Sequence, residues 1–237
     1  MLNGVEDLSK DYLSKLLQVS DSAYPTGSFS HSYGLEGMLQ IGVIKNESDL
    51  QLFIEQEIDH SLKHLELPIL HHAYLSLDKG DFAELSYWDK LSGAAKQPTE
   101  FRLASTRVGK QRFRLLRDVI GAESIDSITW EKIDSALPSK HLAVVSAIES
   151  WTLEIPLKVA MISYSVQNYA SILTAALKLM RLGQTAIQRI LHQHSKNASY
   201  LVDEAMTILP EKIGSFTPLL DIAACQHQRA FSRMFLS

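Results

Sequence analysis

The stretch that most strongly indicates the fold class runs from residue 156 to residue 182 and reads PLKVAMISYSVQNYASILTAALKLMRL. Its large apolar residues recur at steps of three, four and seven, at Val159, Ile162, Val166, Tyr169, Leu173 and Met180. This spacing predicts one long α-helix, with Gly183 as its C-cap. Positions 159–177 carry no charged residue, but serine, glutamine and asparagine are spread among them. We therefore expect a helix that is buried on most sides of a protein rather than one that spans a membrane.

Similar helical signals recur along the rest of the chain. The pattern predicts helices over about 48–65, 68–77, from 81 onward, 98–120, 126–136, 140–153 and 184–209. Ser48 and Asp81 each begin a capping box, and Gly80, Gly121 and Pro210 are typical helix ends. No segment shows sustained two-residue alternation, so we expect no strand. The predicted fold is all-α, a single-domain bundle of roughly eight to ten helices over residues 1–237.

The composition supports this fold class and narrows the function classes. The 237 residues include only eleven glycines and seven prolines, too few for the frequent turns of an all-β sandwich. A net charge of −4 argues against a general nucleic-acid binder. Cys225 is the single cysteine, which excludes an internal disulfide framework and Cys-rich zinc sites, and its apolar neighbours indicate a packed side chain. The first residues do not resemble a secretory signal, so we expect a cytoplasmic protein.

The motifs of common catalytic and cofactor sites are missing from the sequence. Neither the phosphate-binding G-x-x-x-x-G-K-[ST] pattern nor the dinucleotide-binding G-x-G-x-x-G pattern occurs. Residues 27–31 read GSFSH, which is not a serine-hydrolase elbow. We therefore expect no enzyme activity, no cofactor and no catalytic residue.

One metal-site alternative remains open. Glu57, His60 and His64 are spaced by three and four residues, so they share one face of a predicted helix. Two histidines and a carboxylate are ligands for zinc, iron or nickel. The alternative function is therefore a helical metal-binding protein or metalloenzyme, whereas the plainer interpretation is a polar outer helix face with no metal.

A line of basic residues is predicted on another helix. Arg107, Lys110, Arg114 and Arg117 follow one another at steps of three, four and three residues, so they lie on one face. A solvated outer face is one interpretation of this pattern. The other is a patch that meets an acidic protein partner.

Two stretches do not fit a plain helical pattern. The first is 21–36, with Pro25, Gly27 and Gly34, and the second is 211–237, with Gly214 and Pro218. Function often lies on segments that depart from the scaffold. We also expect a mobile N-terminus over 1–10 and a partner-docking role for the C-terminal segment 211–237.

These two stretches carry a resemblance to a known family. Residues 21–36 read DSAYPTGSFSHSYGLE, which closely resembles the N-terminal signature of the urease accessory protein UreF family. Residues 217–237 read TPLLDIAACQHQRAFSRMFLS and resemble the closing motif of that family, and the RLGQ of 181–184 is also similar. The sequence departs from the family pattern at Gln228, Phe231 and Ala224–Cys225, and at residues 142–145 after His141.

The resemblance implies an all-α, dimer-forming chaperone or adaptor for nickel insertion into urease. Family members work in the cytoplasm, bind the accessory protein UreD (also called UreH), recruit or regulate the GTPase UreG, and dock on apo-urease. We expect no nucleic acid and no membrane as partners, because the net charge is −4 and the uncharged stretch 159–177 is interrupted by polar residues. We also expect no cofactor and no metal site in this chain. The partner-binding residues expected from the two motifs are Asp21, Ser22, Pro25, Gly27, Phe29, His31, Ser32, Glu36, Asp221, His227, Phe231, Ser232, Arg233 and Phe235.

The residue types give each motif a physical meaning. Pro25 and Gly27 favour a tight turn, from which we expect Phe29 and His31 to project as recognition groups. Phe231 and Phe235, with Met234, can form an apolar docking face that orders on a partner. The alternative is that both motifs are structural, an elbow and a last helix that packs on its own domain.

Overall fold

The computed structural model describes residues 11–121 and 124–237, without the side chains of residues 11 and 29. Ten helical runs and no strand occur in this part of the chain, which confirms the predicted all-α bundle. The expected mobility of residues 1–10 concerns residues outside the described part. Among the described helices, none is long and apolar enough to cross a membrane.

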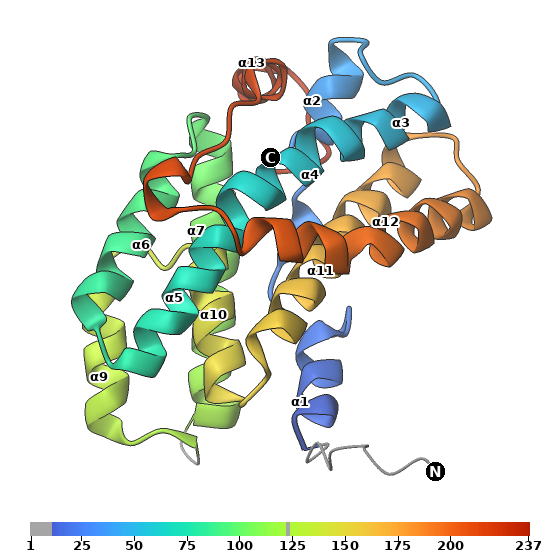
Figure 1. Cartoon of the computed structure of the whole chain (residues 1–237). Helices are drawn as coiled ribbons and strands as arrows, with labels where there is room; N and C mark the ends of the chain where they lie inside the picture. Colours follow the sequence, from blue (N-terminus) through green and yellow to red (C-terminus); the bar gives the residue numbers. More distant parts are fainter. Residues whose placement is uncertain (1–10, 122–123) are drawn as a thin grey trace, which may run out of the picture.

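The helices follow one another around a single large core (Figure 1). They are α1 (Asp11–Ser20), α2 (Leu35–Gln40), α3 (Glu47–Phe53), α4 (Asp59–Ser61), α5 (Leu67–Lys79), α6 (Phe82–Ala94), α7 (Thr99–Leu115), α9 (Ser127–Ala136), α10 (Leu142–Thr152), α11 (Leu157–Leu179), α12 (Gln184–Ala205) and α13 (Pro218–His227). π-helical turns η2 (Ile54–Ile58), η3 (Leu62–Glu66) and η4 (Leu116–Gly121) continue neighbouring helices, and η1 (Ser28–Ser30) and η5 (Pro210–Lys212) are short 3₁₀ turns.

Helix α10 lies at the centre of the bundle. All its residues except Trp151 are buried, and it packs against α5, α7 and α11. A helix that is buried on nearly all sides needs a mainly apolar surface, and the one charged residue of α10, Glu149, is paired with Arg112 inside the fold. The long helix α11 is buried or half-buried at most positions between 159 and 177, as predicted from its spacing.

The region from 47 to 79 differs from the sequence prediction. We expected two helices with a break near Pro68, but α3, η2, α4, η3 and α5 form one continuous helical run. A proline inside a helix removes one hydrogen bond and crowds the carbonyl four residues earlier. Here π turns precede Pro68, and the His64 carbonyl instead accepts from the Gly214 N–H at 2.9 Å. The first cap is also different, because Asn46 rather than Ser48 accepts from the Asp49 N–H.

Other helix ends are partly as predicted. Gly80 adopts a left-handed φ of 67° and ends α5, and the Asp81 side chain accepts from the Glu84 N–H at 2.9 Å. The prediction that Gly183 caps α11 is wrong, since α11 ends at Leu179 and Gly183 precedes the first turn of α12 with an extended backbone. Helix α12 ends at Ala205, earlier than the expected 209.

The two irregular stretches lie together in space, although they stand at opposite ends of the sequence. Helix α13 packs against α2 and α7, and residues 228–237 then run back along the segment that precedes α2 (Figure 1). Leu220, Ala223 and Phe235 join the main hydrophobic cluster. The scaffold therefore brings both motifs to one place.

Candidate functional site

The two motifs pair through main-chain hydrogen bonds. The Leu236 N–H donates to the Ser30 carbonyl at 2.9 Å, and the Ser32 N–H donates to the Ser237 carbonyl at 2.6 Å. The Ser32 hydroxyl donates to the same Ser237 oxygen at 2.6 Å, and Nδ1 of His31 lies 2.9 Å from the Ser237 hydroxyl. Segments 30–36 and 232–237 therefore form one unit, which we call the motif junction.

Glu36 holds the returning chain in place. Its carboxylate accepts from the Met234 N–H at 2.8 Å and from the Phe235 N–H at 2.9 Å, while its own N–H lies against the Ser32 hydroxyl. The residue is only 6% exposed, so these are buried, charge-assisted hydrogen bonds. They place the Phe235 side chain in the core, with 5% of its surface exposed.

A buried network of charged and titratable groups lies beside Glu36. The two ring nitrogens of His227 face two carboxylates, with Nε2 at 3.2 Å from Glu36 and Nδ1 at 2.9 Å from Glu100. The other oxygen of Glu100 accepts from the Arg233 guanidinium at 2.9 Å. These four side chains connect α2, α7, α13 and the segment after α13. Each buried carboxylate thus has at least one donor, as burial of a charge requires.

Two glycines allow α13 to approach α2 closely. A Cβ on Gly34 would lie 2.3 Å from Cδ1 of Leu220, and a Cβ on Gly37 would lie 2.8 Å from the Ala223 carbonyl oxygen. Gly34 also has a left-handed φ of 88°, which side-chain-bearing residues rarely adopt. A larger residue at Gly37 would push α13 away from α2, and one at Gly34 would displace the Leu220 side chain.

The expected partner-binding residues separate into two groups. Exposed in the described structure are Asp21, Ser22, Pro25, Gly27, Phe231, Ser232 and Arg233. Buried in the motif junction are His31, Ser32, Glu36 and Phe235, and His227 is buried beside it in α13. Asp221 is half-buried. The side chain of Phe29 lies outside the described part of the structure.

The expectation that His31 projects toward a partner is therefore wrong. The side chain is 3% exposed, and burial together with the Arg107 charge lowers the pKa of His31 to about 4. The turn chemistry of Pro25 and Gly27 is as expected, because Gly27 has a left-handed φ of 78°. The turn residues did not predict that His31 contacts Ser237 instead of solvent.

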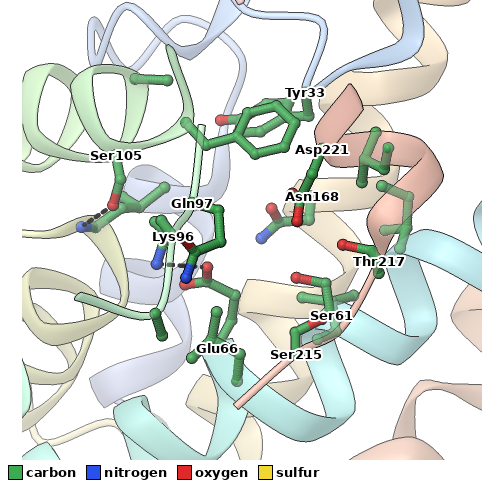
Figure 2. Close-up of a pocket in the computed structure, with 18 of the residues that line it drawn as sticks. Tyr33, Ser61, Glu66, Lys96, Gln97, Ser105, Asn168, Ser215, Thr217 and Asp221 are labelled. Carbon is green, nitrogen blue, oxygen red and sulfur yellow. Dashed lines mark hydrogen bonds and ion pairs between the residues drawn. The ribbon is translucent and has the colours of Figure 1, made fainter. Parts of the chain in front are cut away.

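A cavity of about 100 Å³ opens next to the motif junction (Figure 2). Tyr33 and Asp221, one from each motif, line it together with residues of the 47–79 run, α7 and α11. On its wall the Glu66 carboxylate pairs with the Lys96 ammonium at 2.7 Å and accepts from the Tyr164 hydroxyl at 3.2 Å. Burial raises the pKa of the Asp221 carboxyl above its usual range.

The sequence did not point to several members of the site. No sequence pattern singled out Glu100, Glu66 or Lys96, yet all three side chains are buried or nearly so. Only the packing of α7 and α13 shows that Glu100 has partners more than 120 residues away, at His227 and Arg233. When an acidic residue pairs with a basic residue far away in the chain, the local sequence around either one does not predict the pair.

The metal-site alternative gains no support from the arrangement of its residues. The rings of His60 and His64 lie with centroids 4.5 Å apart, but Glu57 sits in the π-helical turn η2. π turns change the number of residues per turn, so the three- and four-residue spacing no longer ensures a common face. Within residues 11–121 and 124–237, no group of three or more His, Cys, Asp or Glu side chains is placed to hold a metal ion.

Cys225 also differs from its prediction. We expected a packed side chain, but the thiol is exposed on the outer face of α13. The helix buries Leu220, Ala223, Ala224 and His227 instead, so position 225 points outward.

Comparison with known proteins now decides the family. The UreF family model matches residues 44–195, which is more than half of the chain. The chain belongs to the UreF family. Curated relatives named urease accessory protein UreF include that of Trichormus variabilis, 28% identical with 97% of this chain and 98% of the relative covered. That of Pseudoalteromonas translucida is 30% identical, with 94% and 93% covered, and that of Methylobacillus flagellatus is 30% identical, with 95% and 97% covered.

The UreF match and the motif junction concern different parts of the chain. Both terminal motifs lie outside residues 44–195, whereas the alignments with whole UreF relatives extend over nearly the full length. The UreF resemblance found in the motifs and the family match in the helical middle are thus two separate lines of support. The exposed UreF motif residues named above are accessible to a partner, and the buried ones are not.

Proposed function

We propose that this chain is a urease maturation factor that acts as a non-enzymatic adaptor. It binds the accessory protein UreD/UreH, recruits or regulates the GTPase UreG, and docks on apo-urease during nickel delivery, as a cytoplasmic homodimer. Membership of the UreF family supports a role in urease maturation, and the relatives are named as accessory proteins. The sequence contains no phosphate-binding loop, which is consistent with a separate GTPase.

One structural observation supports binding through the C-terminal motif. Large apolar side chains are exposed on and around α13: Phe216, Leu219, Ile222, Phe231, Met234 and Leu236. Phe231 is completely exposed, whereas Phe235, four residues later, is buried in the core. Exposed apolar groups gathered on one segment are typical of protein interaction sites, and aromatic residues are common among their energetic hot spots. We call this set the apolar face.

The motif junction explains how a short segment can present such a face. Glu36 and Ser32 bind the main chain of residues 234–237, so the apolar side chains of that segment stand on a held backbone. A preordered surface loses less conformational entropy on binding. The junction is therefore proposed to position the face, and the exposed side chains are proposed to contact UreD/UreH.

The test uses point variants of the apolar face rather than a deletion. Removing residues 217–237 would strip Leu220 and Phe235 from the core and confuse folding with binding. We expect the double variant Phe231→Ala, Met234→Ala to fold normally and to lose at least about tenfold in affinity for UreD/UreH. Tyr200→Ala on α12 is the control, because Tyr200 is exposed to about the same degree as Met234. Wild-type affinity in the double variant would contradict the proposed face, and failure of the wild type to bind would contradict the proposed function.

A further inference from the structure

We propose that α7 carries a second docking surface, for an acidic helix of a partner protein. The surface, here called the basic stripe, consists of Arg107, Lys110, Arg114 and Arg117. All four side chains are exposed. The three- and four-residue spacing keeps Arg107, Lys110 and Arg114 on one face of α7, and Arg117 follows in the π-helical turn η4. Ten residues at 1.5 Å each give the stripe a length of about 15 Å. Neither motif requires these charges, so the inference goes beyond the proposed function.

The positive charges of the stripe are poorly compensated within the chain. Among the described residues, only the Asp118 carboxylate lies within ion-pair distance, at 3.6 Å from Arg114 and 3.4 Å from Arg117. Arg107 and Lys110 have no such partner in that part of the structure. The protein as a whole carries a net charge of −4, so this local excess is opposite in sign to the rest of the surface. Such a patch attracts and orients a negatively charged partner.

Arg112, on the opposite face of α7, is a buried arginine with a structural role and can be compared with the stripe. Arg112 is 7% exposed and donates to the Glu149 carboxylate at 2.6 Å, to Gln167 at 3.1 Å and to the Val19 carbonyl at 3.1 Å. Its donors are used inside the fold. The stripe residues are exposed instead, and among the described residues only Arg114 and Arg117 have an ion-pair partner, Asp118.

The helix that carries the stripe is held firmly. Val108 and Phe113 are buried, and Gly109 packs so closely that a Cβ there would lie 2.0 Å from the Lys140 carbonyl oxygen. The Gln111 side chain donates to the Pro25 carbonyl at 3.3 Å, which places the stripe beside the N-terminal motif. Charges at fixed spacing on a rigid helix can meet carboxylates that have the same spacing on another helix.

The neighbours of the stripe favour a protein partner over a nucleic acid. Leu103 continues the line one turn earlier and is 44% exposed, so an amphipathic helix can place an apolar residue against it. No aromatic residue occupies positions 103, 107, 110, 114 or 117, whereas proteins that bind single-stranded nucleic acid set stacking aromatics among their cations. The inferred occupant is therefore an amphipathic helix with a row of glutamates or aspartates.

The experiment measures binding of a synthetic amphipathic helix to the full-length chain by fluorescence anisotropy. The probe carries glutamates at the stripe's spacing and one leucine, and a second peptide has glutamine in place of glutamate. The variant Arg107→Glu, Lys110→Glu, Arg114→Glu should weaken binding of the acidic probe at least about tenfold at low ionic strength. Lys90→Glu, Arg181→Glu, Lys196→Glu changes the net charge equally at exposed positions elsewhere and should have little effect.

The other outcomes are informative as well. Equal weakening by both triple variants would overturn the proposal, because the attraction would then be a general charge effect. Stripe-dependent binding of duplex RNA or of phosphatidylserine vesicles that is tighter than binding of the acidic peptide would overturn the choice of a protein helix. Stripe-dependent peptide binding by a chain that fails to bind UreD/UreH would support the stripe and contradict only the proposed function.

Discussion

Replacing Glu36 by glutamine should release the segment after α13 from the body of the protein. The Glu36 carboxylate uses both oxygens to bind the N–H groups of Met234 and Phe235, and it faces Nε2 of His227 at 3.2 Å. Glutamine has nearly the same shape but only one acceptor oxygen. Its NH₂ group would point a donor at a main-chain N–H that is also a donor.

The size of the effect follows from the burial of these groups. A hydrogen bond to a charged group contributes about 1.5–3 kcal/mol, and an unpaired buried donor costs about 1–3 kcal/mol. We therefore expect Glu36→Gln to lose about 2–4 kcal/mol of stability at the motif junction. For a chain of this size, that corresponds to a fall in Tm of about 5–10 °C if the junction unfolds together with the rest.

Two measurements together test this expectation. Hydrogen exchange reports protection of the amides of residues 234 and 235, and thermal denaturation reports global stability. If the segment detaches before the bundle unfolds, exchange of these amides accelerates while Tm changes little. Glu131→Gln, the same replacement on the exposed surface of α9, is the control. Unchanged protection at 234 and 235 combined with an unchanged Tm would refute the role given to Glu36.

Two further predictions concern packing and pH. Gly37→Ala should destabilise the protein by about 1–3 kcal/mol in urea unfolding, because its Cβ would lie 2.8 Å from the Ala223 carbonyl oxygen, whereas Gly214→Ala meets no atom within 4 Å and should be nearly neutral. Equal effects of the two glycine replacements would contradict the close approach of α13. The pKa of His31 is lowered to about 4 in the folded protein, so the unfolded chain binds the proton more readily and stability should fall as pH drops from about 6.5 toward 4. His31→Gln should make this pH dependence shallower, and an identical pH profile for the variant would show that the imidazole does not contribute.

The helical fold was largely accessible from local sequence features. The apolar spacing of 156–182 predicted α11, the Asp81 cap and Gly80 predicted the boundary between α5 and α6, and scarce glycine and proline argued against a sheet protein. These features act through neighbours within four residues on the same helix, so they can be recognised without knowing the fold. Pro68 shows where this local reasoning failed. Pro68 has no N–H to donate to the His64 carbonyl, and the Gly214 N–H donates there instead. No local sequence pattern predicts this contact.

The candidate site divides in the same way. Its two motifs were recognisable from their residues alone, including the turn at Pro25 and Gly27. Their pairing was not recognisable, because Ser32 and Glu36 meet residues about 200 positions later only after α2 and α13 have packed. Burial then decides the role of each side chain, since it turns His31 and Glu36 inward and leaves Phe231 in solvent. Hydrogen bonding and desolvation depend on which groups are neighbours in space, and that information exists only in the tertiary structure.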